Sequence, residues 1–214
     1  MGKLFRYDSP VMQKLAMVGN LVVLNLLWIL CSLPVFTLGA ATAAMHTVIF
    51  QYITDTEDAV LKPFFRAFGK CFRQATVFWI PVLLVSLLLS WNLLYFAGLE
   101  GGGSNFFFAL FLVLGVILVI LLTYAFPLMG RYESPLGHII RNSYLLFIME
   151  FKKSLFILVV ELLPWAMLLL VPGLFLRLGI LWFFLGCTAT AYWNDKVILK
   201  IFEKHQRKEE AEEG

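Results

Sequence analysis

Long hydrophobic blocks alternate with short charged segments along the whole chain. A membrane span needs about 20 mostly apolar residues to cross a hydrocarbon core of about 30 Å. The pattern therefore predicts an all-α fold, a polytopic transmembrane helical bundle with about six spans. The hydrophobic blocks are residues 15–54, 75–99, 101–130, 154–176 and 178–194.

The first block is too long for one span and has the length of two. Pro34 and Gly39 fall near its middle, where a chain turns and returns. We therefore expect spans at 15–36 and 38–54, although the second is short and a re-entrant helix is the alternative. The other four spans are predicted near residues 75–97, 106–127, 154–172 and 175–194.

Lysine and arginine collect in the head, in the tail and in two linkers, and these basic residues resist translocation. All of them lie on one side only if the first block crosses twice, which supports six spans with both termini in the cytoplasm. We predict interfacial helices near 59–74 and 135–153. The transmembrane domain covers 1–194, and a charged cytoplasmic tail that frays at its end covers 195–214.

Composition agrees with a membrane location. Hydrophobic residues make up 61% of the chain and charged residues 14%, whereas soluble domains have about 45–50% and about 25%. The first block is also longer than the apolar core of a cleavable signal peptide, about 7 to 15 residues. We therefore expect residues 15–36 to remain in a multi-pass protein of the plasma membrane.

The 59–74 segment carries a stripe of positive charge when drawn as a helix. Its phenylalanines lie mostly on the opposite side, so it reads as an amphipathic interfacial helix. One interpretation is an elbow that holds the next span against anionic lipid. The other is a docking surface for a cytoplasmic partner, formed by Lys62, Arg66, Lys70, Arg73, Phe65 and Phe68.

Glu161 lies several residues inside a predicted span, where a carboxylate is costly unless it is paired, protonated or hydrated. Together with Asn25 and His46 it forms a candidate intramembrane polar site. The alternative is structural: Glu161 lies near an interface or neutralises a basic group such as Arg141, and scattered polar residues join helices through hydrogen bonds.

Small residues follow the predicted turn and suit close helix packing. No nucleotide-binding or hydrolase motif occurs, so we expect no enzyme activity, no cofactor and no nucleic-acid partner. The three cysteines lack metal-ligand spacing and His46 stands alone in sequence, so no metal site is expected. The predicted packing residues are Gly39, Ala40, Ala43 and Ala44.

Two stretches, together with the overall chain length and its spaced hydrophobic spans, carry a resemblance to a known family. Asn25, Trp28 and the following LPVFTLGAATAA, together with FRAFGKCFRQAT at Phe65 to Thr76, resemble the YesL-like family, a domain of unknown function. This resemblance implies a multi-pass membrane protein of Gram-positive bacteria that is often encoded beside carbohydrate ABC transporter components. It implies no catalytic residues.

Two hypotheses follow. In the first, the chain is a non-catalytic accessory or regulatory subunit associated with carbohydrate ABC transport, and it binds a permease or another membrane partner. In the second, it is a small-solute carrier, with sugar as one candidate solute, that uses the polar site around Glu161. A polar cavity containing Glu161 favours the carrier, whereas a closed bundle with an exposed phenylalanine and arginine surface favours the accessory subunit.

Overall fold

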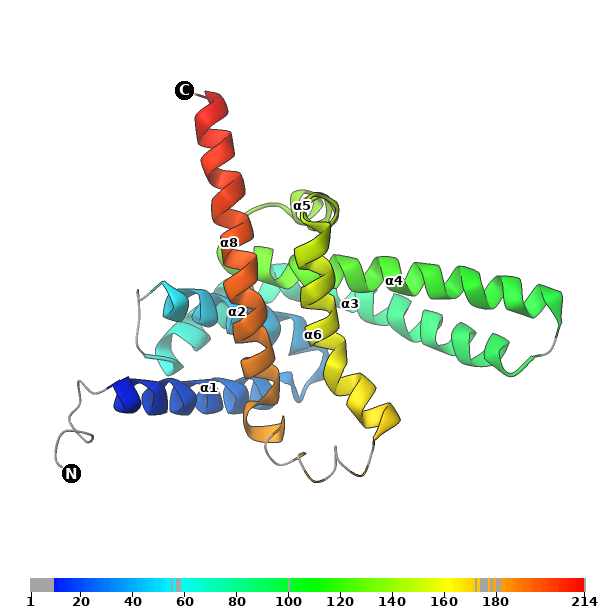
Figure 1. The fold of residues 1–214 in the computed structure, drawn as a ribbon, viewed down its shortest axis with the longest axis horizontal. Helices are drawn as coiled ribbons and strands as arrows, with labels where there is room; N and C mark the ends of the chain where they lie inside the picture. The colour runs from blue at the N-terminus through cyan, green and yellow to red at the C-terminus, as the bar shows by residue number, and fades with distance from the viewer. Residues whose placement is uncertain are drawn as a thin grey trace.

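The computed structural model describes residues 10–54, 56, 59–99, 101–171, 173, 177, 179 and 182–213. Helices and turns account for this part of the chain, and no strand occurs in it (Figure 1). The α-helices are α1 (Pro10–Ser32), α2 (Leu38–Ile53), α3 (Leu61–Ala97), α4 (Gly102–Arg131), α5 (Leu136–Met149), α6 (Phe151–Leu170) and α8 (Cys187–Glu213). A short 3₁₀ helix, η1 (Val35–Thr37), and a π-helix, η2 (Trp182–Gly186), complete the elements.

Helix α2 forms the centre of the molecule, and it follows α1 through a tight turn. Pro34 has an extended backbone, which ends α1 and starts η1. Trp79 of α3 donates its indole N–H to the Val35 carbonyl over 2.8 Å and so fixes this turn. Helix α2 then packs against α1, α3, α4 and α8, and most of its residues are buried.

The small residues of α2 lie where the neighbouring helices come closest. Gly39, Ala40, Ala43 and Ala44 are all buried. A Cβ atom added to Gly39 would lie 2.6 Å from the Cβ of Trp79, so α2 and α3 touch through backbone. Gly130 plays the corresponding part for α4, because a Cβ there would lie 2.8 Å from the Ala43 carbonyl oxygen.

Helices α3 and α4 form a long antiparallel hairpin that projects beyond the rest of the protein (Figure 1). Large apolar side chains cover the projecting part: Leu94 is 76% exposed, Trp91 73% and Phe106 65%. Soluble proteins rarely expose apolar surface of this extent, because water disfavours it. A lipid bilayer is compatible with such a surface.

Three helices of the described chain are long and apolar enough to cross a membrane: α1 over Leu15–Ser32, α3 and α4. The prediction of a helical membrane protein is thus supported. Six spans and cytoplasmic termini stay predictions. Figure 1 also shows that α6 and α8 run across the direction of α3 and α4, which differs from a bundle of parallel spans.

The interfacial helix expected at 59–74 is not a separate element. It continues into the predicted span 75–97 as the 37-residue helix α3. The junction contains no proline or glycine to break the helix, and extending a helix is cheaper than starting one. At 1.5 Å per residue α3 is about 55 Å long, well above the about 30 Å of a hydrocarbon core. Helix α3 is therefore longer than one crossing of the core requires.

The segment expected at 135–153 forms α5, which ends at Met149 and is followed at once by α6. Glu150 makes this corner. Its carboxylate accepts a hydrogen bond from Lys204 of α8 and forms an ion pair with Lys153 over 3.0 Å. These ammonium groups, Lys204 first, hold the pKa of Glu150 below its usual range although burial raises it.

Glu150 is expected to stabilise the fold at neutral pH and not in acid. A carboxyl whose folded-state pKa is depressed stabilises above its ordinary pKa of about 4.3, and the contribution is lost as pH falls through the folded value. Glu150→Gln should therefore cost about 1 kcal/mol at neutral pH and less near pH 3, measured by thermal unfolding in detergent. The half-buried Glu203→Gln, on α8, is the matched control. An equal loss at both pH values would contradict this assignment.

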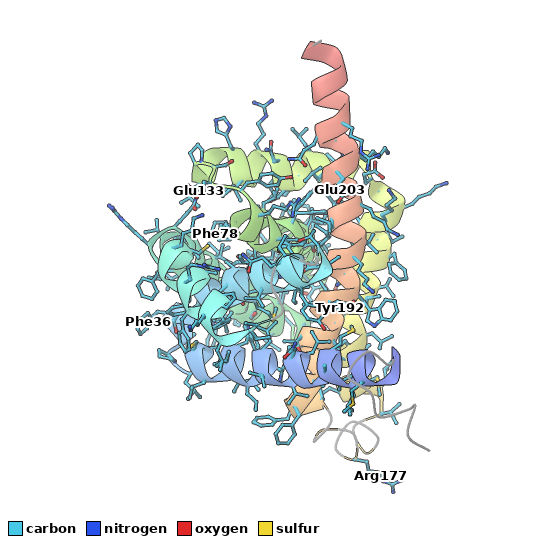
Figure 2. All side chains as sticks on the ribbon, turned by 90° about the vertical axis from the view of Figure 1, so that its left-hand side faces the viewer. Phe36, Phe78, Glu133, Arg177, Tyr192 and Glu203 are labelled. Carbon is cyan, nitrogen blue, oxygen red and sulfur yellow. The ribbon has the colours of Figure 1, made fainter. Side chains whose placement is uncertain are left out.

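The domain boundary expected at 194/195 does not coincide with a structural boundary. Helix α8 runs through it to Glu213, and Asp195, Ile198 and Phe202 are buried in the core. Tyr192 lies at the level of the core and Glu203 nearer the C-terminal end of α8 (Figure 2). Much of the first part of the span expected at 175–194 lies outside the described residues, and the described chain continues from Trp182.

Candidate functional site

A pocket of about 380 Å³ lies between α1, α2, α6, η2 and α8. Its walls are mostly apolar and aromatic, with Trp28 and Trp182 as the largest side chains. A few polar groups reach it, as in small-molecule sites in general. The lining residues are Trp28, Thr42, Met45, His46, Glu161, Pro164, Trp182, Cys187, Thr190, Ala191 and Asn194.

A buried ion pair stands beside this pocket. The Nδ1 atom of His46 lies 2.9 and 2.8 Å from the two carboxylate oxygens of Asp195, and the Asp195 side chain is fully buried. His46 is on α2 and lines the pocket, and Asp195 on α8 holds the His46 side chain. Because buried charges are costly without a partner, the pair fixes the position of the imidazole ring.

Glu161 projects into the same pocket from α6. Its carboxylate accepts long hydrogen bonds from Thr123 (3.4 Å) and from the amide of Asn194 (3.5 Å). In the described part of the chain no basic side chain forms an ion pair with Glu161, so Arg141 does not neutralise it there. The pocket therefore holds one carboxylate in addition to the His46–Asp195 pair.

The structure brings two of the three predicted polar-site residues together and separates the third. His46 and Glu161 share the pocket, whereas Asn25 is fully buried elsewhere. The Asn25 amide donates to the Phe183 carbonyl over 2.6 Å and accepts from the Thr188 backbone N–H over 3.1 Å. Asn25 thus joins α1 to the junction of η2 and α8.

Three residues of this region are not predicted from the sequence. In the sequence, Asp195 is the first residue of the predicted tail and Asn194 is its neighbour. Thr123 is one hydroxyl residue in an apolar helix. The adjacent Asn194 and Asp195 directly after an apolar block are the available signal. Their partners on α2 and α6 are too distant in sequence for spacing to reveal.

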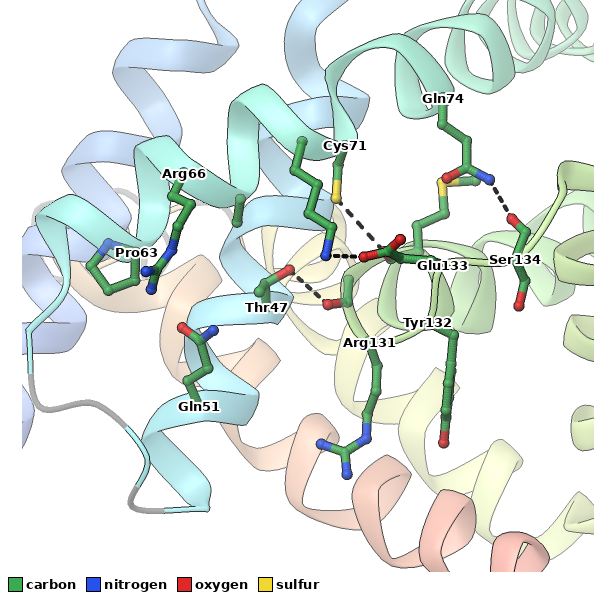
Figure 3. A pocket seen from close by; sticks show the side chains of 14 residues that line it. Thr47, Gln51, Pro63, Arg66, Cys71, Gln74, Arg131, Tyr132, Glu133 and Ser134 are labelled. Atoms are coloured by element: carbon green, nitrogen blue, oxygen red, sulfur yellow. Dashed lines mark hydrogen bonds and ion pairs between the residues drawn. The ribbon is translucent and has the colours of Figure 1, made fainter.

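A second hollow of about 320 Å³ lies where the first turns of α3 meet the end of α4 (Figure 3). Lys70 forms an ion pair across it with Glu133, and this holds the pKa of Glu133 below its usual range. The Gln74 side chain donates to the Ser134 carbonyl over 2.6 Å. These contacts join α3 to the segment between α4 and α5.

The predicted docking residues occupy the same turns of α3. Lys62, Arg66, Lys70 and Arg73 are exposed and form the feature that we call the basic strip. Phe65, beside them, is 52% exposed. Aromatic and arginine side chains of this kind are enriched in protein interfaces in general.

The opposite face of these turns packs against protein. Phe64 is fully buried, Cys71 is buried, and Phe68 is half-buried against the core. An interfacial helix would turn this aromatic face toward lipid, and that expectation is wrong for Phe64 and Cys71. Helices α1 and α2 supply the apolar surroundings of Phe64, and α2 and α4 supply those of Cys71. Phe72 remains exposed at the edge.

Comparison with known proteins gives two matches. Residues 21–93 match a family described as "Protein of unknown function, DUF624". The chain is also 30% identical over 131 residues to a Bacillus subtilis (strain 168) protein described as "Uncharacterized protein YesL". That alignment covers 59% of this chain and 61% of the relative, so the chain spans about three fifths of the relative's length. No solved structure matches the chain.

Proposed function

Because these matches confirm the resemblance of the chain to the YesL-like family, we propose that it is a non-catalytic accessory or regulatory subunit of the bacterial plasma membrane. Its expected partner is the permease of a carbohydrate ABC transporter or another membrane subunit. The observation that carries the proposal is the basic strip with Phe65, which stands exposed on a helix too long to be contained in the bilayer.

The orientation of the protein belongs to the same proposal. The basic first turns of α3 and the end of α4 meet at Lys70 and Glu133, whereas the α3–α4 turn lies at the far end of the hairpin (Figure 1). Basic segments resist translocation, which supports a cytoplasmic place for the strip and an external place for the turn. Both termini are then proposed to be cytoplasmic.

Partner binding at the strip combines charge with an aromatic anchor. Exposed Phe65 offers apolar area at a position flanked by Lys62 and Arg66. Aromatic and arginine side chains are enriched in the energetic centres of protein interfaces, and complementary charge speeds association. The matching partner surface is a cytoplasmic loop or helix with acidic side chains and an apolar pocket.

We expect charge reversal on the strip to remove the partner. The full-length tagged protein is purified from its native membranes in mild detergent, and every co-purifying chain is quantified. Lys62→Glu with Arg73→Glu should reduce a partner present in fixed ratio by about tenfold or more, because opposite charges at a complementary interface become like charges. The matched control reverses Lys200 and Arg207, which are also exposed and lie on α8.

A second variant separates the surface from the internal ion pair. Lys70→Glu combined with Glu133→Lys keeps an ion pair across the hollow but reverses the charge at one position of the strip. This swap should lose the partner while the protein remains folded. If the strip variants and the α8 control retain the same co-purifying chains, or if the protein is isolated without any stoichiometric partner, the accessory role is refuted.

The pocket supports a second candidate, a small-solute carrier. A polar site containing Glu161 and His46 inside a membrane protein is the feature expected of a solute or proton pathway. Reconstituted vesicles test it with sugars as solutes: uptake that Glu161→Gln abolishes supports the carrier, and uptake equal to that of protein-free vesicles contradicts a sugar carrier.

A further inference from the structure

We propose that the pocket between Trp28, Trp182 and Glu161 binds a small organic cation, a protonated primary amine with an apolar body. This inference does not rest on the accessory role. It deepens the carrier candidate by naming a ligand class, although binding at the pocket does not require transport.

Several hydrogen-bond donors around the pocket are already engaged. The Trp28 indole N–H donates to the Thr42 hydroxyl over 3.1 Å, and the Thr42 hydroxyl donates to the Leu38 carbonyl over 2.8 Å. The Thr190 hydroxyl donates to the Gly186 carbonyl over 2.7 Å. His46 donates through Nδ1 to Asp195. An anionic ligand, which requires donors, therefore finds few of them here.

The acceptors are less well satisfied. Glu161 accepts hydrogen bonds of 3.4 and 3.5 Å, which lie beyond the usual 2.7–3.2 Å range. Asn194 is 2% exposed, and its Oδ1 atom accepts no hydrogen bond from the described residues. A primary ammonium has three donors and no acceptor, which matches the Glu161 carboxylate with its long hydrogen bonds.

The charge of the pocket points the same way. His46 is held by Asp195, so Glu161 remains as one carboxylate that forms no ion pair with a described residue. An ionised carboxylate in such surroundings is costly without a counter-charge. A protonated amine supplies that charge together with the missing donors.

The size and walls of the pocket indicate an organic cation rather than a metal ion. A volume of about 380 Å³ falls within the range of small-molecule sites, about 300–1,000 Å³. No three histidine, cysteine or acidic side chains of the described chain gather closely enough to hold a metal. Trp28 and Trp182 offer aromatic rings, and indole is the best aromatic partner for a cation.

Trp182 is held in place by a contact that a single methyl group would disrupt. A Cβ atom on Gly186 would lie 2.3 Å from Cδ2 of the Trp182 ring, so the indole packs directly on the glycine. Gly186→Ala must therefore move the ring. This substitution changes the aromatic wall of the pocket and leaves the charge of Glu161 unaltered.

Equilibrium binding to the purified full-length protein in lipid nanodiscs tests the inference with three probes of nearly equal shape. Phenethylamine is positively charged at neutral pH, 2-phenylethanol is neutral and phenylacetate is negatively charged. We expect saturable binding of the amine, at least about tenfold weaker binding of the alcohol, and no binding of the anion.

The variants assign the binding to the pocket. Glu161→Gln should weaken the binding of the amine by about tenfold and leave the binding of the alcohol nearly unchanged. The control Glu203→Gln should change neither affinity. Gly186→Ala should weaken the binding of the amine because it displaces the Trp182 ring. Equal affinity of amine and alcohol, or equal effects of the Glu161 and Glu203 variants, would overturn the inference. Amine binding without uptake into vesicles would uphold it and refute the carrier.

Discussion

Replacing His46 by leucine is expected to destabilise the protein by about 3–5 kcal/mol, the largest effect that we expect of any single substitution considered. The fully buried Asp195 would lose the histidine that lies 2.8–2.9 Å from its carboxylate oxygens. The carboxylate must then remain unpaired in the core or take up a proton, and both are costly. Denaturant or thermal unfolding of the protein in detergent measures the loss.

The double variant His46→Leu with Asp195→Leu distinguishes the ion pair from simple loss of packing. Removing both partners leaves no uncompensated charge, and replacing a whole buried pair by apolar groups is often nearly neutral. We therefore expect the double variant to recover most of the stability that His46→Leu loses. If the two substitutions instead add, the pair does not act as a unit and the assignment is wrong.

The helices could be predicted from the sequence because their signals are local. The length of the first apolar block and the position of Pro34 predict two helices with a turn, and the structure has α1 and α2 joined by η1. The charge-poor run at 106–127 likewise lies inside α4. Each of these predictions depends on residues that are neighbours in the chain.

The arrangement of the site could not be predicted because it depends on tertiary contacts. His46 and Asp195 are 149 residues apart, and no periodicity connects them. The structure of the 59–74 segment could not be predicted for a different reason. Its stripe of charge suggests a separate interfacial helix, but residues on its other face, such as Phe64, pack against protein, and the helix continues into the next segment.

The site depends on a rigid centre, since α2 presents His46 to the pocket and Thr42 to its rim. The side chains of α2 are positioned by the close contacts that it makes with α3 and α4. Its central position explains why small residues are required along it: bulkier side chains would move the helix and with it the polar groups of the pocket.

Substituting Gly39 by alanine is expected to lower the free energy of unfolding by about 1–3 kcal/mol or more. This is the second-largest effect that we expect. The new Cβ would lie 2.6 Å from the Cβ of Trp79 and 3.0 Å from the Ala75 carbonyl oxygen. Neither atom belongs to the flexible end of a side chain, so α2 and α3 must move apart. The bond between Trp79 and the Val35 carbonyl, which fixes the α1–α2 turn, would be strained by the same movement.

Gly115→Ala is the matched control, because it makes the same change in α4 where nothing lies within 4 Å of the added atom. It should leave the unfolding temperature unchanged or raise it slightly, since alanine favours helices more than glycine does. A loss for Gly39→Ala and none for Gly115→Ala, by thermal unfolding in detergent, would show that the close approach of α2 and α3 is required. Equal behaviour of the two variants would mean that these helices tolerate separation, and that α2 does not hold the pocket residues in place by packing.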